Sequence, residues 1–121
     1  MKHKKAGRKF GRVRSQRRAL LRTILGSLVM NEKITTTEAK AKEIKSLIDP
    51  IINKAKVAKK DSIKKVAILR DLRIVIPVMA VRKLSGSFCQ KFEARNSGYT
   101  RVVKLQPRKS DSAKMAVIEF V

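Results

Sequence analysis

The first 31 residues of this chain carry ten basic side chains and no acidic one. Charges of one sign repel each other, and they are stabilised against a polyanion, where each can neutralise a phosphate and release a bound counterion. Arginine adds geometry, because its planar guanidinium can bind a phosphate through two hydrogen bonds and can stack on an unpaired base. We therefore predict that this segment binds nucleic acid through Lys2, His3, Lys4, Lys5, Arg8, Lys9, Arg12, Arg14, Arg17, Arg18 and Arg22.

The charge of the whole chain supports this prediction. A net charge of +22 on 121 residues lies far beyond what solubility needs. With only four Phe and one Tyr, the chain is not expected to form the aromatic stacking platform of an RNA-recognition motif. Charge and shape must carry the binding.

The sequence has few residues that could support catalysis or metal binding. His3 and Cys89 are the only residues of their types, and the nine acidic residues are dispersed. An N-terminal His can chelate Cu(II) or Ni(II), but with no second ligand nearby a phosphate or base contact is the preferred interpretation of His3. Cys89 is expected to be a buried free thiol in a reducing compartment. No Gly-rich phosphate loop is present. We predict no enzymatic activity, no metal, no cofactor and no small-molecule substrate.

Targeting signals are also not evident. The apolar run that begins at Ala19 is interrupted by Arg22 and Ser27. It fits neither a secretory signal nor a membrane span of roughly 20 residues. The sequence predicts a cytosolic protein, and an Arg-rich, acid-free start leaves an organellar transit peptide open.

Two regions are predicted: an extended basic RNA-binding arm over 1–14 and a single domain over 15–121. Gly7 and Gly11 disfavour a helix in the arm, which should become ordered on binding. A helix should begin near Ser15, where apolar residues share one face. These are Leu21, Ile24, Leu25 and Leu28.

A strand or extended link is predicted at 34–36, followed by a helix for which Thr35 and Glu38 have capping-box spacing. The apolar face of this helix runs from Ile44 to Ala55, with an expected kink at Pro50. Lys40 and Lys42 lie off this face, and each is either a solvated charge or an RNA contact. A third helix should be capped by Asp61 or Ser62 and should carry Ile63, Val66, Ala67 and Leu69.

The C-terminal part is predicted to form a strand pair. Residues 74–84 favour a strand by β-branched propensity, whereas Pro77 argues against a central one. Phe88 and Phe92 are predicted anchors onto the core. Strands over 99–105 and 115–121 should form an antiparallel hairpin, on which Arg101 and Lys104 are further candidates for RNA contact.

Several segments resemble the family of the seventeenth protein of the bacterial large ribosomal subunit. They are MKHKKAGR at 1–8, RRALLR at 17–22, GSL at 26–28, EKITT at 32–36, KAKE at 40–43, GYTRVVKL at 98–105 and AKMAVIE at 113–119. Two positions depart from the family: Gln16 stands where a His is usual, and Ser110 stands where a Gly usually precedes Asp111.

The resemblance implies an α+β fold, with about four helices packed on a small mixed sheet closed by the C-terminal hairpin, and it favours helix for 74–84. It also implies a ribonucleoprotein role in translation: binding to large-subunit rRNA near the exit of the peptide tunnel, beside neighbouring ribosomal proteins, in a cytoplasmic or organellar ribosome.

Two other functions remain open. A general nucleic-acid-binding or DNA-compacting protein is possible because phosphate attraction alone does not distinguish RNA from DNA. A cationic protein of the membrane surface is the other, since the helix beginning near Ser15 is basic at one end and apolar along one side. That apolar side is more simply explained as a core face, so we predict no membrane partner.

Overall fold

The computed structural model describes residues 7–121. This part of the chain forms four α-helices, one short 3-10 helix and three strands. In chain order they are α1 (Arg14–Asn31), β1 (Lys33–Thr37), α2 (Glu38–Lys60), α3 (Lys65–Val75), α4 (Val78–Ser85), η1 (Ser87–Phe92), β2 (Thr100–Lys104) and β3 (Met115–Phe120).

The strands form one sheet in the order β1-β3-β2. Both pairings are antiparallel, so β3 runs opposite to each of its neighbours. The predicted α+β class and C-terminal hairpin are confirmed. The sheet is antiparallel throughout rather than mixed, because β1 lies along the free edge of β3 in the same direction as β2.

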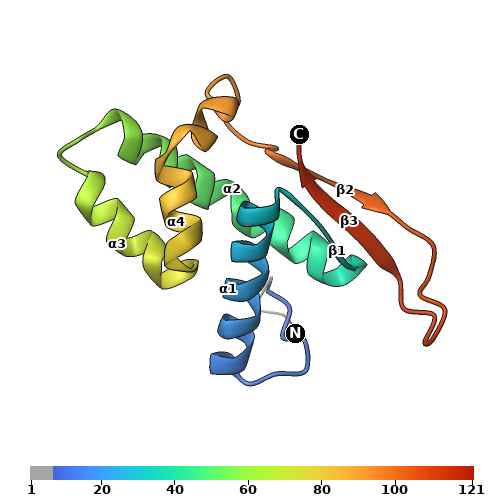
Figure 1. Cartoon of the computed structure of the whole chain (residues 1–121). Coiled ribbons are helices and arrows are strands. Elements are labelled where there is room, and N and C mark those ends of the chain that lie inside the picture. Colours follow the sequence, from blue (N-terminus) through green and yellow to red (C-terminus); the bar gives the residue numbers. More distant parts are fainter. Residues whose placement is uncertain (1–6) are drawn as a thin grey trace.

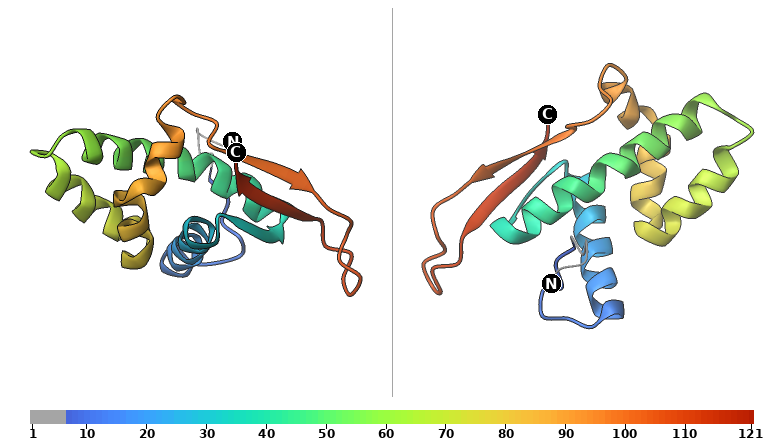
Figure 2. Two further views of the ribbon diagram at one scale, coloured as in Figure 1. Left: turned by 45° about the horizontal axis from the view of Figure 1, so that its top comes forward. Right: turned by 180° about the vertical axis from the view of Figure 1, so that it is seen from behind.

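Helix α2 is the centre of the core. Its predicted apolar face is confirmed, since Ile44, Ile48, Ile51, Ile52 and Ala55 are all buried. Seen from behind, α2 runs from the sheet at one end to α3 at the other (Figure 2). Helix α1 crosses in front of α2 (Figure 1) and contributes the buried side chains Leu25, Leu28 and Val29.

The start of α2 differs from the prediction. Its N-cap is Thr37, whose side chain accepts a hydrogen bond from the Lys40 amide at 3.5 Å. Thr35 instead lies in β1 opposite Val117, because strand pairing holds the chain extended for two more residues. Pro50 lies inside α2 without ending it, and the kink there remains a prediction.

The third helix begins later than predicted, at Lys65. The Asp61 carboxylate accepts hydrogen bonds from the Ile63 and Lys64 amides, so it stabilises a turn before the helix. Ile63 lies in this turn and is 90% exposed, so its predicted place in the helix is wrong. Val66 is also exposed, and the fully buried residue of α3 is Leu72.

Residues 74–84 form neither a strand nor one continuous helix. Helix α3 ends at Val75, and α4 begins directly after Pro77. Ile76 between them is extended, as a residue before proline prefers. Proline lacks an amide hydrogen and here serves as the N-cap of α4. The helical expectation is thus confirmed, with a break that Pro77 dictates.

The predicted aromatic anchors are confirmed. Phe88 and Phe92 of η1 are buried and contact each other edge to face, with ring centroids 5.4 Å apart. Phe92 also contacts Tyr99, and both Phe88 and Phe92 contact Phe120 of β3. These rings attach the segment before β2 to the core, so the hairpin extends from a fixed base (Figure 1).

Candidate nucleic-acid interface

A tight turn leads into α1. Phe10 and Gly11 both have positive φ angles, 54° and 63°. The Arg12 guanidinium donates a hydrogen bond to the Phe10 carbonyl oxygen at 2.7 Å. Residues 7–13 loop back beside α1 (Figure 1), and the Arg8 Nε lies 4.0 Å from a carboxylate oxygen of Glu43. Lys2, His3, Lys4 and Lys5 lie outside the described residues.

The N-terminus of α1 has no neutralising partner. Its N-cap, Val13, has no side chain that can accept from the first-turn amides, and the first turn contains no acidic residue. Arg14, Arg17 and Arg18 have no carboxylate within ion-pair distance anywhere in residues 7–121. Free amides, the positive end of the helix dipole and three guanidinium groups together form a site that attracts anions.

Arg22 has a different role from its neighbours. One Nη2 atom donates to the carbonyl oxygens of Arg73 at 3.3 Å and Ile76 at 3.4 Å. These carbonyls lie at the C-terminal end of α3, where helices leave acceptors unsatisfied. Arg22 therefore holds α1 to α3, a contact that the sequence pattern did not reveal, while its side chain stays exposed.

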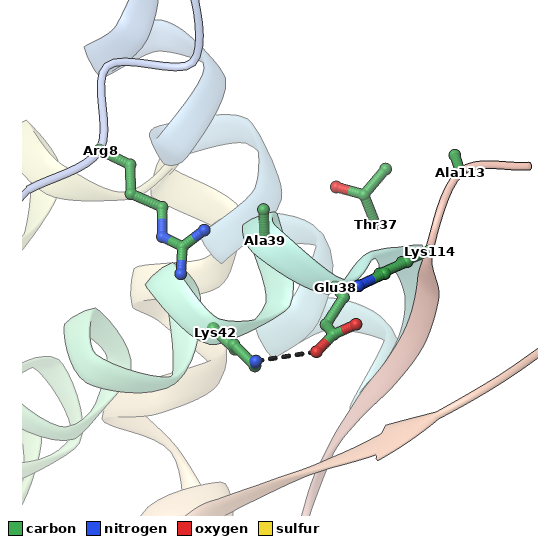
Figure 3. Close-up of a pocket in the computed structure, with 7 residues that line it drawn as sticks. All are labelled: Arg8, Thr37, Glu38, Ala39, Lys42, Ala113 and Lys114. Atoms are coloured by element: carbon green, nitrogen blue, oxygen red, sulfur yellow. Dashed lines mark ion pairs between the residues drawn. The ribbon is translucent and has the colours of Figure 1, made fainter. Parts of the chain in front are cut away.

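A second group of candidate cations surrounds a hollow of about 330 Å³. Figure 3 shows Arg8 from the arm, Lys42 from α2 and Lys114 from the hairpin around it. The Lys42 ammonium lies 2.8 Å from the Glu38 carboxylate, and Lys104 lies 3.7 Å from it. The hydrogen bond from Lys42 is the main cause of the lowered pKa of Glu38.

Lys114 was missed by sequence reasoning, although its position directly before a predicted strand offered a signal. Its carbonyl oxygen accepts a hydrogen bond from the Glu38 amide at 2.9 Å, which fixes the hairpin beside the start of α2. Four cations, Arg8, Lys42, Lys104 and Lys114, therefore face two carboxylates here, Glu38 and Glu43, and the surroundings stay positive.

Arg101 is paired across the sheet. Its Nε lies 2.8 Å from Glu119, and the same carboxylate lies 3.7 Å from Lys33. The register explains this arrangement, because Glu119 of β3 faces Lys33 on one side and Arg101 on the other. The Arg101 hydrogen bond is the main cause of the lowered pKa of Glu119. Arg101 is thus less available to a phosphate than the α1 arginines.

The remaining candidates are Lys9 and Lys40. Lys9 is exposed and Lys40 is half-buried, and neither has a carboxylate partner in the described part of the chain. The structure thus divides the described candidates into an unpaired group, which includes Arg14, Arg17 and Arg18 at the start of α1, and a group paired with carboxylates. The paired candidates are Arg8, Lys42, Arg101 and Lys104.

Residues 7–121 contain no group of three His, Cys, Asp or Glu side chains able to hold a metal ion. Cys89 is buried, its Sγ lies 3.0 Å from the Leu84 carbonyl oxygen, and burial raises the pKa of the thiol. Within the same residues, every helix is too short or too polar to cross a lipid bilayer.

Known proteins match this chain over nearly its whole length. Residues 20–121 match the ribosomal protein L17 family. A large ribosomal subunit protein bL17 from Staphylococcus carnosus is 40% identical over 94% of this chain and 98% of its own length. The proteins of that name from an aster yellows witches'-broom phytoplasma and from Chlorobium chlorochromatii are each 43% identical. They cover 93% and 100% of this chain, and 97% and 75% of their own lengths.

These matches confirm the resemblance noted in the sequence, and a ribosomal protein family agrees with the prediction of a structural, non-enzymatic protein. The chain belongs to the ribosomal protein L17 family.

Proposed function

We propose that this chain is a structural constituent of the large ribosomal subunit, where it binds large-subunit rRNA near the peptide tunnel exit and contacts neighbouring ribosomal proteins. Its relatives are named large ribosomal subunit proteins. The observation that carries the RNA-binding part is the uncapped N-terminus of α1, where three arginines have no carboxylate partner among the described residues.

The mechanism is charge neutralisation. Folded RNA brings phosphates close together, and each cation placed between them replaces condensed counterions. The 1–14 arm and the first turn of α1 supply this charge in one continuous stretch, while the α+β body of 15–121 fixes its direction. The protein acts as a wedge whose basic end enters the RNA.

The test compares two triple variants with the same loss of net charge. Arg14→Gln, Arg17→Gln and Arg18→Gln together remove the unpaired group. Lys42→Gln, Arg101→Gln and Lys104→Gln remove cations that are paired with Glu38 or Glu119. Binding to a structured large-subunit rRNA fragment is measured over a series of salt concentrations.

The first variant should reduce the slope of log affinity against log salt by about 2 to 3, because each lost phosphate contact removes about 0.7–0.9. The second should reduce the slope by less than one. Equal effects would contradict an interface centred on α1, and a preference for duplex DNA over structured RNA at matched salt would favour a DNA-compacting protein.

A further inference from the structure

A small apolar hollow lies between α1 and α3, separate from the one shown in Figure 3. Its volume is about 180 Å³, and it is lined by aliphatic side chains and two arginines. Leu25 at its base is fully buried, whereas Ile74 is 69% exposed and Val75 is 39% exposed. The aliphatic lining residues are Leu21, Leu25, Leu47, Ile74 and Val75.

The charges at this hollow are all of one sign. Arg18 and Arg22 are its charged lining residues, and no acidic side chain lines it. Guanidinium groups only donate hydrogen bonds, so a ligand that binds here should have hydrogen-bond acceptors at its edge. One nitrogen of the Arg22 guanidinium donates to the Arg73 and Ile76 carbonyls, so this end of the side chain is held beside the hollow.

The hollow lies at the end of a row of arginines that starts at the candidate interface. Arg14, Arg18 and Arg22 are four residues apart on α1 and therefore lie along one side of the helix, about 6 Å apart along its axis. This row begins at the uncapped N-terminus and ends at the hollow. A nucleic-acid strand whose phosphates follow the row would bring its next base to the aliphatic walls.

We propose that this hollow binds a single unpaired base of RNA, with Ile74 and Val75 against its face and Arg18 and Arg22 at its edge. The proposal rests on the proposed rRNA binding and names one contact within it. Unpaired bases in folded RNA are available for such insertion, and they offer both an apolar face and edge acceptors. An apolar side chain of a partner protein would fill the space between the walls but would leave the Arg18 guanidinium without an acceptor.

The test uses two five-residue RNA strands of equal charge. One strand has abasic sites at all five positions. The other differs from it only at the central position, which carries guanine. Guanine is chosen because its O6 and N7 atoms form an acceptor pair that a guanidinium can bind through two hydrogen bonds. Affinities for the full chain are measured by fluorescence anisotropy at low ionic strength. The affinity ratio of the two strands isolates the contribution of the base.

The guanine strand should bind about tenfold more tightly to the unmodified protein, the lower part of the range for a bidentate arginine–guanine contact. Ile74→Ser and Arg18→Gln should each reduce this ratio to about two or less. The matched controls are Ile63→Ser, at the most exposed isoleucine, and Arg82→Gln, at an exposed arginine of α4 outside the hollow. Both should keep the ratio of the unmodified protein. Melting temperatures confirm that all four variants are folded.

Equal affinities of the unmodified protein for both strands would overturn the proposal, as would equal losses in the controls. In the first case, salt-dependent binding of the abasic strand would leave the proposed rRNA binding intact. If Ile74→Ser weakened attachment to the large subunit but left the affinity ratio of the two strands unchanged, the proposal would be overturned and the hollow would bind a protein partner instead. Failure of both strands to bind would count against the proposed function as well.

Discussion

At the scale of single residues, the cations of this chain differ in what they contact rather than in type. Arg14 and Arg18 have no carboxylate partner within residues 7–121, whereas Arg101 shares Glu119 with Lys33. Sequence alone identifies all of them as basic, but it cannot show which are paired, because these pairs depend on strand register. Exposed ion pairs contribute little to stability. Their importance here is that they reduce the charge available to a phosphate.

Cys89 provides a test of the core at this scale. It is 1% exposed, and burial raises the pKa of its thiol, so little reactive thiolate is available near neutral pH. We expect a disulfide reagent such as Ellman's to modify the native protein at least about a hundredfold more slowly than free cysteine. Complete modification should follow unfolding in guanidinium. Rapid modification of the native protein would contradict the packing of η1 on the core.

Gly26 tests the contact between α1 and the start of α4. A Cβ added there would lie 2.7 Å from the Cγ and Cδ atoms of Pro77, so the helices must separate to admit it. Gly26→Ala should lower the free energy of unfolding by about 1–3 kcal/mol, although alanine favours a helix by about 1 kcal/mol. Gly86→Ala is the matched control, since its Cβ meets only ordinary contacts. Urea denaturation of both variants measures the change in the free energy of unfolding. An increase in stability for Gly26→Ala would contradict the close contact between α1 and Pro77.

At the scale of elements, the regular spacing of apolar residues predicted the buried faces of the helices correctly, but the sequence did not predict where the helices begin. The buried faces of α1 and α2 were predictable because an apolar repeat over several turns is a stronger signal than the conformational preference of any single residue. The starts of α2 and α3 were not, since Thr37 and Asp61 form hydrogen bonds that several sequence positions could have made. Of the candidate site, the basic α1 end could be predicted from composition. The hollow beside it could not, because it depends on the contact of Arg22 with the Arg73 and Ile76 carbonyls, which is a tertiary feature.

The tip of the β2–β3 hairpin has its own test. The Arg108 guanidinium donates two hydrogen bonds to Asp111, and together with the Ala113 amide it lowers the pKa of that carboxyl from 3.8 to about 2. Ser112, rather than Ser110, takes the left-handed conformation, with φ 56°. The departure from Gly at position 110 therefore does not strain the turn.

Because the folded pKa is lowered, the contribution of this ion pair is complete above pH 3.8 and is lost as the pH falls towards about 2. We expect an NMR titration of the Asp111 carboxyl and the Ala113 amide to share a midpoint near 2. Asp111→Asn should remove the transition at the amide. A midpoint near 4 would mean that Arg108 does not hold the carboxylate in solution.

At the scale of the whole molecule, charge is distributed unevenly about a neutral apolar core. Ten of the 31 basic residues lie before the first acidic residue, Glu32, and among residues 7–121 the buried core residues all follow position 24. The proposed RNA-binding segment and the residues that form the core are therefore largely separate along the chain. On this proposal, the body remains folded while the basic end adapts to RNA.

Removal of residues 1–14 tests this separation. The deletion takes away seven Lys and Arg side chains and no buried core residue among those that the structure describes. The thermal unfolding temperature should change little, whereas affinity for structured rRNA should fall and its dependence on salt should flatten. An unchanged salt slope would contradict the assignment of the arm as an RNA-binding segment.

The central claim is that this chain is a built-in component of the large ribosomal subunit. Sedimentation of tagged full-length protein from cell lysate through a sucrose gradient, with and without a high-salt wash, tests it most directly. We predict stoichiometric retention with the large subunit after the wash. Release into the free, nucleoid or membrane fractions would contradict the claim.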